Sequence, residues 1–363
     1  MYMQERHRVM RTSQEEMKVE QKIVLQDIEK AYDKEAPVIS DLNLEIPEGS
    51  FTVLLGPSGC GKSTTLRMIA GLEQETKGTL YISGRDMKHV KPGDRGIAMV
   101  FQNYALYPTM TVKENIEFGL KNNKVPKEER EARIKEVSRA VGLEEYLSRK
   151  PGALSGGQRQ RVALARAMVK KPEVFLMDEP LSNLDAKLRT QLRTDLIELH
   201  NRLGATFVYV THDQVEAMSM GTNIVLMNKG KIMQQGTPYK IYHDPDNVFT
   251  AQFIGAPPMN ILDLSELSYE YMPFDEAAFL GFRPEYAMLL RSGEGAGQKG
   301  LTIKGRVATH EMLGTETLYK IDTDYGRIQV KLFDAAETVD EEVAVFVPHN
   351  RILYFDADEQ RLR

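Results

Sequence analysis

The chain has 363 residues, of which 42% are hydrophobic and 27% charged, and its formal net charge is −5. This is the composition of an ordinary globular protein of about two domains, and the single cysteine excludes disulfide frameworks and cysteine-rich zinc sites within one chain. No apolar run reaches the ~18 residues of a membrane-spanning helix, and the first residues lack a signal-peptide pattern, so we expect an intracellular protein.

Charge and polarity differ between the two ends of the chain. Residues 1–21 are polar and aperiodic, which predicts a mobile extension or a vector-derived leader. Residues 237–363 contain 12 Lys and Arg against 21 Asp and Glu. Because nucleic-acid-binding surfaces are basic, we expect no nucleic-acid partner there, and a solvated acidic surface is the simplest interpretation.

Short apolar runs alternate with helical patterns between Ile23 and Asn228. Consecutive apolar positions are typical of strands that are buried on both faces of a parallel sheet. Strands that alternate with helices predict an α/β domain. The predicted strands are Phe51–Leu55, Ile97–Phe101, Val174–Met177, Phe207–Val210 and Ile224–Met227.

The first of these strands leads into a segment that matches the pattern GxxxxGK[ST] in full, and a helical run, Lys62–Ala70, follows it. Glycines let backbone N–H groups converge on phosphate oxygens, and the start of a helix adds partial positive charge. We expect Lys62 to reach the β- and γ-phosphates of a nucleotide and the Ser63 hydroxyl to bind Mg²⁺. Cys60 is interpreted as a small loop residue, with redox sensing as the less favoured alternative. The segment consists of Gly56, Pro57, Ser58, Gly59, Cys60, Gly61, Lys62, Ser63 and Thr64.

Polar residues follow three further predicted strands. Asp178 and Glu179 come at the end of Val174–Met177, and ligands of open α/β sheets bind at the carboxyl ends of strands. We therefore expect Asp178 to face Mg²⁺ and Glu179 to polarise a water molecule toward the γ-phosphate. Gln102 and His212 follow their own strands in the same way, and each taken alone is equally compatible with a structural role.

Three helices are predicted in the middle of the α/β region. In Lys127–Val141 the apolar residues fall on one stripe, and two acid–base pairs have the i,i+4 spacing that supports a helix. The other two helices are Gly157–Val169 and Ala186–Leu203. The stripe consists of Ile134, Val137 and Val141, and the pairs are Glu129/Arg133 and Glu131/Lys135.

A second glycine motif, Leu154–Gln158, precedes the helix over Gly157–Val169. Free N–H groups at a helix N-terminus suit an anion, although Ser155 is equally suited to be a simple N-cap. One chain thus carries two candidate phosphate-binding loops. Two subunits with such loops are able to hold a nucleotide between them.

The pattern changes after Lys231. Gly236 and the segment Gly255–Pro258 mark a boundary zone. Beyond it, apolar and polar residues alternate, which predicts a small β-rich domain of barrel-like form. The alternating apolar positions are Leu301, Ile303, Val307, Ile328, Val330 and Leu332.

In the order of its motifs, the chain resembles the ATP-binding subunits of ABC transporters, over about residues 22–363. The resemblance rests on Tyr32, the glycine-rich loop, Gln102, Leu154–Gln158, Asp178-Glu179, Ser182–Asp185 and His212. It implies an α/β fold, a P-loop NTPase with a helical subdomain at about 103–170 inside an ATPase domain at 22–236, and a smaller OB-like regulatory domain at 237–363. Phe101–Pro108 and Phe282–Glu285 resemble the maltose-type importer ATPases, which serve carbohydrate uptake, although importers of polyamines, iron or glycerol phosphate have similar appended domains.

The resemblance also implies roles for individual residues. Tyr32 would stack on adenine, the alternative being a core tyrosine. Glu179 would be the general base, His212 would contact the γ-phosphate, and Gln102 would contact the metal or the attacking water and couple to the permease. Asp185 would lie at a dimer interface, and the residues that would bind the γ-phosphate held by the other subunit are Ser155, Gly157 and Gln158.

The implied partners are a second copy of the chain, the transmembrane permease subunits and, indirectly, an extracytoplasmic solute-binding protein. The implied cofactors are ATP and Mg²⁺, and the implied location is the cytoplasmic face of the membrane. ATP binding would close the dimer and hydrolysis would reopen it. Two alternatives stay open: a soluble ABC ATPase that acts on ribosomes or DNA, and an interaction protein whose ATPase activity is incidental.

Overall fold

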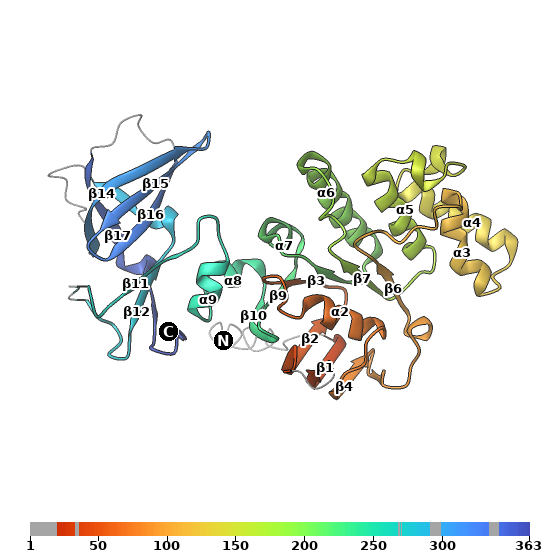
Figure 1. The fold of residues 1–363 in the computed structure, drawn as a ribbon, viewed down its shortest axis with the longest axis horizontal. Coiled ribbons are helices and arrows are strands. Elements are labelled where there is room, and N and C mark those ends of the chain that lie inside the picture. Colours follow the sequence, from red (N-terminus) through yellow and green to blue (C-terminus); the bar gives the residue numbers. More distant parts are fainter. Residues whose placement is uncertain (1–19, 33–35, 268, 270, 291–298, 334–340) are drawn as a thin grey trace, which may run out of the picture. The chain divides into compact units, whose positions relative to one another are not determined.

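The computed structural model describes residues 20–32, 36–267, 269, 271–290, 299–333 and 341–363. The polar extension predicted for residues 1–21 lies outside them, except that Gln21 already belongs to the first strand, β1 (Gln21–Lys30). The chain divides into two compact units between Ile232 and Met233, a few residues before the predicted boundary at 236/237 (Figure 1). No helix in the described ranges has the length and apolar character needed to cross a bilayer.

A six-stranded sheet with the order β10-β9-β3-β8-β7-β6 forms the centre of the N-terminal unit. Its neighbours from β9 to β6 run parallel. Every residue of β3, β7 and β8 is buried, as predicted for strands that are covered on both faces. The predicted α/β class is confirmed. The strands are β3 (Phe51–Leu55), β6 (Ile97–Val100), β7 (Val174–Asp178), β8 (Thr206–Val210), β9 (Asn223–Asn228) and β10 (Lys231–Gly236).

Different layers cover the two faces of this sheet (Figure 1). One face shares a hydrophobic cluster with α2 (Lys62–Ala70) and with a second sheet, β2-β1-β4-β5, which the sequence analysis missed. On the other face, the rings of Phe51 and Phe207 pack edge-on against His200 of α6 (Ala186–Leu203). The remaining strands of the second sheet are β2 (Ile39–Pro47), β4 (Lys77–Ile82) and β5 (Arg85–Asp86).

The helical elements agree closely with the sequence prediction. α2 and α6 have the predicted ends, and α4 (Lys127–Ala140) and α5 (Gly156–Met168) differ by one residue. Of the two predicted ion pairs, the one between Glu129 and Arg133 forms. The pairing of Glu131 with Lys135 was wrong, because Glu131 instead lies 4.0 Å from the Lys127 ammonium, one turn earlier. Two further helices are α3 (Val112–Asn122) and α7 (Gln214–Met220).

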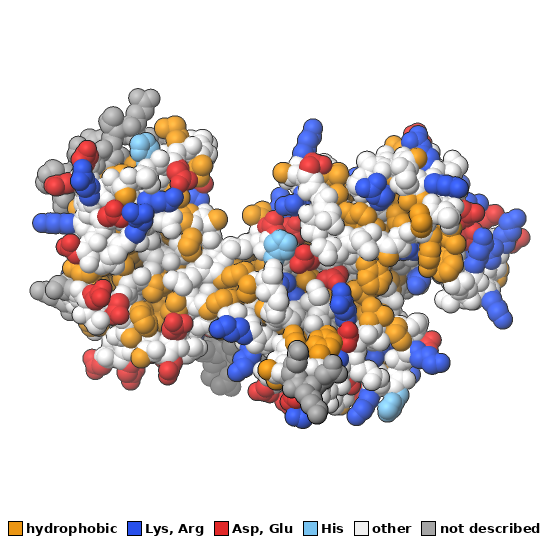
Figure 2. All heavy atoms as spheres, viewed as in Figure 1, with side chains coloured by type: hydrophobic (Ala, Val, Ile, Leu, Met, Phe, Trp, Pro, Cys, Tyr) orange, Lys and Arg blue, Asp and Glu red, His pale blue; other side chains and the backbone are white. Residues whose placement is uncertain are grey.

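The C-terminal unit is built on two antiparallel sheets, β11-β12-β18-β19 and β13-β17-β14-β15-β16, around one apolar core. The predicted alternation is confirmed, since Leu301, Ile303, Ile328 and Val330 are buried between exposed or partly exposed neighbours. Figure 2 shows acidic side chains gathered along the lower edge of this unit, in keeping with its negative charge. Its elements are α8 (Pro238–His243), α9 (Val248–Phe253), β11 (Asn260–Asp263), β12 (Phe279–Phe282), β13 (Met288–Leu290), β14 (Gly300–Met312), β15 (Glu316–Thr323), β16 (Gly326–Phe333), β17 (Glu342–Pro348), β18 (Leu353–Phe355) and β19 (Arg361–Leu362).

A buried arginine of the Phe282–Glu285 segment holds α8 and α9 in this unit. The Arg283 side chain is 2% exposed, and its guanidinium donates to the carbonyl oxygens of Ala251 (3.0 Å), Ile254 and Tyr242 (2.8 Å). Its carbon Cζ also lies 4.2 Å from the centre of the Tyr242 ring. The arginine of this motif therefore serves as a packing clamp, because its guanidinium donates to carbonyls at the ends of two helices.

We expect Arg283→Met to destabilise the C-terminal unit by about 2–4 kcal/mol, because methionine fills the space but removes the three hydrogen bonds that the guanidinium donates to carbonyl oxygens. Calorimetry of the full chain should show a lower melting temperature for one transition only. Arg351→Met is the matched control, since Arg351 is exposed and the contact described for its guanidinium is with the ring of Tyr286, 4.5 Å away. Equal effects of the two substitutions would contradict the clamp.

Candidate functional site

The glycine-rich loop joins β3 to α2 at the carboxyl edge of the central sheet. Gly56 has a φ of +149°, and a Cβ there would come within 2.2 Å of the Met227 carbonyl oxygen, so only glycine fits. Lys62 is 5% exposed, and its ammonium donates to the carbonyl oxygens of Gly56 and Pro57, both at 2.8 Å. Cys60 is buried inside the loop, with its sulfur 3.7 Å from that ammonium. The loop thus keeps a positive charge poised beside the N-terminus of α2.

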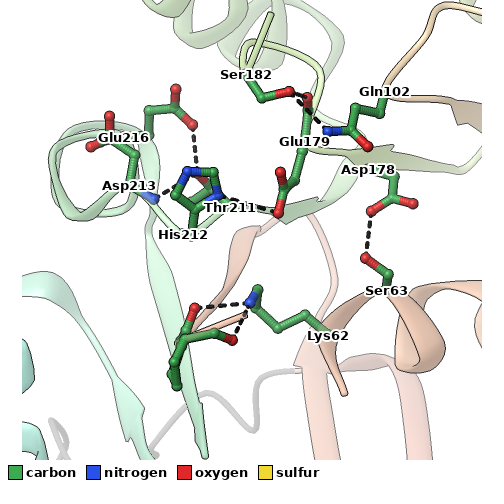
Figure 3. Close-up of polar contacts among 12 residues, drawn as sticks. Lys62, Ser63, Gln102, Asp178, Glu179, Ser182, Thr211, His212, Asp213 and Glu216 are labelled. Carbon is green, nitrogen blue, oxygen red and sulfur yellow. Dashed lines mark hydrogen bonds and ion pairs between the residues drawn. The ribbon is translucent and has the colours of Figure 1, made fainter. Parts of the chain in front are cut away.

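The Ser63 hydroxyl and the Asp178 carboxylate meet across this edge, at an oxygen–oxygen distance of 2.8 Å (Figure 3). Ser63 comes from the first turn of α2, and Asp178 is the last residue of β7. Mg²⁺ prefers oxygen ligands such as hydroxyl and carboxylate groups, and water and substrate phosphates usually fill its other coordination positions. This donor pair therefore fits Mg²⁺. The described ranges contain no cluster of three His, Cys, Asp or Glu side chains that would make a closed metal site.

Glu179 and His212 face each other next to the Ser63–Asp178 pair (Figure 3). His212 Nδ1 lies 3.3 Å from Glu179 Oε1, and the two side chains are 57% and 21% exposed. Glu179 has a φ of +43°, a left-handed conformation that costs energy for a residue with a Cβ. The Glu179 amide donates to the Val210 carbonyl at 3.1 Å, which helps to hold this conformation. The carboxylate is thus turned toward the end of the neighbouring strand.

Gln102 reaches the same region from the segment after β6. Its side-chain amide donates to the Ser182 hydroxyl at 3.2 Å, and that hydroxyl donates to the Glu179 carbonyl at 2.9 Å. Ser182 therefore bridges Gln102 and the backbone of Glu179, a function that the sequence analysis did not assign to it. The two ends of this bridge come from separate strands, so spacing along the chain carried no signal for it.

The second glycine motif lies at the N-terminus of α5, where Ser155 and Gln158 form a reciprocal capping box. The Ser155 hydroxyl accepts from the Gln158 amide at 3.3 Å, and the Gln158 side chain accepts from the Ser155 amide at 2.9 Å. The N-cap expectation for Ser155 is confirmed. Asp185 caps α6 in the same manner, accepting from the Leu188 amide at 2.9 Å. A Cβ at Gly157 would lie 2.8 Å from a methyl group of Leu188, so the two helix starts are neighbours.

These two caps make no hydrogen bond with the glycine-rich loop in the described parts of the chain. Tyr32 is 38% exposed, and the Lys30 ammonium lies 4.6 Å from the centre of its ring. The alternative of a core tyrosine is therefore wrong. The structure brings together the predicted residues at the ends of the parallel strands. Within the described residues, no hydrogen bond joins that cluster to Tyr32, Ser155, Gly157, Gln158 or Asp185.

Comparisons with known proteins show the family to which the chain belongs. The ABC transporter family profile matches residues 39–182. The chain is 47% identical over 349 residues to the sn-glycerol-3-phosphate import ATP-binding protein UgpC of Brucella abortus (strain 2308), across 94% of this chain and 99% of the relative. It is 61% identical over 236 residues to the oligosaccharides import ATP-binding protein MsmX of Bacillus subtilis (strain 168), across 65% of each.

A solved dimeric structure of an ATP-binding cassette in a post-hydrolysis state, bound to ADP and Pi, has a TM-score of 0.54 and 34% identity to this chain. It covers 60% of this chain and 98% of that cassette. The predicted family and ATPase activity are confirmed by these relatives. The chain therefore belongs to the ABC transporter family and is one of its import ATP-binding proteins, an enzyme that binds and hydrolyses ATP.

Proposed function

We propose that two copies of this chain bind two ATP molecules between them and use hydrolysis to drive carbohydrate import through membrane permease subunits. The observation that carries the proposal is the meeting of Ser63, Asp178, Glu179 and His212 at one sheet edge, while the capped helix start at Ser155 remains separate from it. A second copy would bring its own α5 N-terminus to this edge. The dimeric cassette among the solved relatives supports that arrangement.

Within the site we assign each group by its chemistry. Lys62 would leave the loop carbonyls to bind the β- and γ-phosphates, and the backbone N–H groups of Gly56–Thr64 would bind their oxygens. Ser63, Asp178 and Gln102 would hold Mg²⁺, which when bound neutralises charge on the phosphates. The exposed ring of Tyr32 would stack on adenine.

In the proposed reaction, Glu179 accepts a proton from the attacking water. The water oxygen forms a bond to the γ-phosphorus as the bond to the β–γ bridging oxygen breaks, and ADP takes up the leaving electron pair. His212, which lies beside Glu179, contacts the γ-phosphate. Ser155, Gly157 and Gln158 of the second copy bind the same phosphate, and Asp185 lies at the dimer interface. Loss of the γ-phosphate removes these contacts, so the dimer reopens.

We further propose that the chain is peripheral at the cytoplasmic face of the membrane. Its partners would be permease subunits that contact Phe101–Pro108 and, indirectly, an extracytoplasmic solute-binding protein. Residues 237–363 would form an OB-like regulatory domain. The oligosaccharide import relative supports carbohydrate as the solute, and the glycerol-phosphate import relative makes that organic phosphate the competing candidate.

Solute uptake tests the proposal. Cells that lack this chain should lose uptake of labelled oligosaccharide, and the intact chain should restore it, whereas the Lys62→Ala variant should not. Uptake of labelled sn-glycerol 3-phosphate, measured in the same cells, serves as the internal comparison. If the cells lose glycerol-phosphate uptake and keep oligosaccharide uptake, the assignment of carbohydrate is wrong.

A further inference from the structure

Next to His212 lies a buried carboxylate that none of the assigned roles uses. Glu216, in the first turn of α7, is 3% exposed. It accepts hydrogen bonds from the Tyr209 hydroxyl at 2.8 Å and from the Thr211 hydroxyl at 2.7 Å, both at the same oxygen, Oε2. Burial raises the pKa of the Glu216 carboxyl above its ordinary value. Burying a carboxyl group costs free energy, so its hydrogen bonds must offset that cost.

The contacts of Glu216 form a closed ring around the backbone of His212. The Thr211 hydroxyl, which donates to Glu216, also accepts from the Asp213 amide at 3.0 Å. The Asp213 carboxylate in turn accepts from the Glu216 amide at 3.2 Å. Residues on both sides of His212 are thus bonded to Glu216, directly or through one partner, as Figure 3 shows.

The hydrogen bonds of this ring do not involve the His212 imidazole. That imidazole is 57% exposed, while Thr211 is buried and its amide donates to the Leu54 carbonyl at 3.2 Å, close to the glycine-rich loop. The Arg189 guanidinium lies 3.6 Å from the other oxygen of Asp213 and anchors the ring to α6. A rigid backbone on both sides of a solvent-facing side chain limits the directions in which that side chain can point.

From this geometry we propose that Glu216 is a positioning residue which, through Thr211 and Asp213, holds His212 in the orientation that meets Glu179 and the γ-phosphate. The inference rests on the proposed role of His212 in hydrolysis. A purely structural role is the alternative, since the hydrogen bond from the Glu216 amide to the Asp213 carboxylate also caps α7. The positioning role and the structural role predict different effects on kcat when the Thr211 hydroxyl or the Tyr209 hydroxyl is removed.

The test compares two hydroxyls that bond the same oxygen. Thr211→Val replaces a hydroxyl with a methyl group at nearly constant volume and opens the ring beside His212. Tyr209→Phe removes the other bond to Glu216 Oε2 and leaves the ring closed. In the full chain, we expect Thr211→Val to lower the kcat of ATP hydrolysis roughly 10- to 100-fold with little change in the KM for ATP, because misplacing a catalytic group costs rate rather than binding. Tyr209→Phe should change kcat less than about two-fold, while lowering the melting temperature to a similar extent.

Two further variants separate positioning from folding. Glu216→Gln keeps an oxygen that accepts both hydroxyl bonds, so it should retain most of the kcat that Glu216→Ala loses. In a His212→Ala background, Thr211→Val should lower kcat no further, because the group that it orients is already gone.

The outcomes distinguish this inference from the proposed function. A parental kcat in His212→Ala would remove the role of His212 and this inference with it. A low kcat in His212→Ala together with a parental kcat in Thr211→Val would overturn the inference alone. Equal losses of kcat in Thr211→Val and Tyr209→Phe, in step with their melting temperatures, would assign Glu216 to folding only.

Discussion

Replacing Glu179 with glutamine should stop turnover while ATP still binds. Glutamine has the size of glutamate and keeps an oxygen that can face His212, but its amide cannot take a proton from water. We expect kcat for ATP hydrolysis to fall by roughly 10²- to 10⁴-fold, the usual contribution of a general base. The Kd for ATP should stay close to the parental value, because the loop residues to which we assign phosphate binding are untouched.

The same variant should accumulate as an ATP-bound dimer. Hydrolysis is the step that removes the shared γ-phosphate, so a chain that binds ATP without hydrolysing it should remain closed. Light scattering after gel filtration, with ATP and Mg²⁺ present, measures this. Glu198→Gln on the exposed surface of α6 is the matched control and should keep parental turnover. A Glu179→Gln variant that hydrolyses ATP at the parental rate would show that another group is the base.

Replacing Lys62 with alanine should weaken ATP binding strongly. The ammonium is buried beside the loop, where its charge is poorly screened and has only neutral carbonyl and thiol partners. Losing one charge-assisted contact to a phosphate costs about 2–3 kcal/mol, which corresponds to a roughly 30- to 150-fold higher Kd. Calorimetric titration with ATP and Mg²⁺ measures the change.

An exposed lysine provides the control for that measurement. Lys88 makes its one described hydrogen bond through its backbone amide, so Lys88→Ala removes a charge of the same kind without touching the loop. We expect its Kd for ATP to match that of the parental chain. Unchanged affinity in Lys62→Ala would contradict the assignment of the glycine-rich segment as the phosphate-binding loop.

Local patterns were sufficient to predict the glycine-rich loop and its neighbours. Strand, loop and helix are contiguous from Phe51 to Ala70, so the motif and the elements on both sides of it can be recognised within one stretch of the sequence. The close approach of the Met227 carbonyl, which only a glycine at position 56 allows, comes from a distant strand. The positions of Asp178 and Glu179 followed from one general rule about parallel sheets. The first antiparallel sheet was missed although Leu42, Leu44 and Ile46 of β2 alternate with polar residues, which is a strand pattern. The pairing of β2 with β1 has register shifts that spacing along the chain does not encode.

What the sequence by itself determined is therefore the family, the α/β core and the set of residue types that chemistry on a phosphate requires. Tertiary structure decided which of them meet: Ser63 with Asp178, Glu179 with His212, and Ser182 between Gln102 and Glu179. It also revealed that Glu216 encloses the backbone of His212. The physical reason is that hydrogen bonds between strand ends depend on sheet order and side-chain burial, which arise only when distant segments pack together.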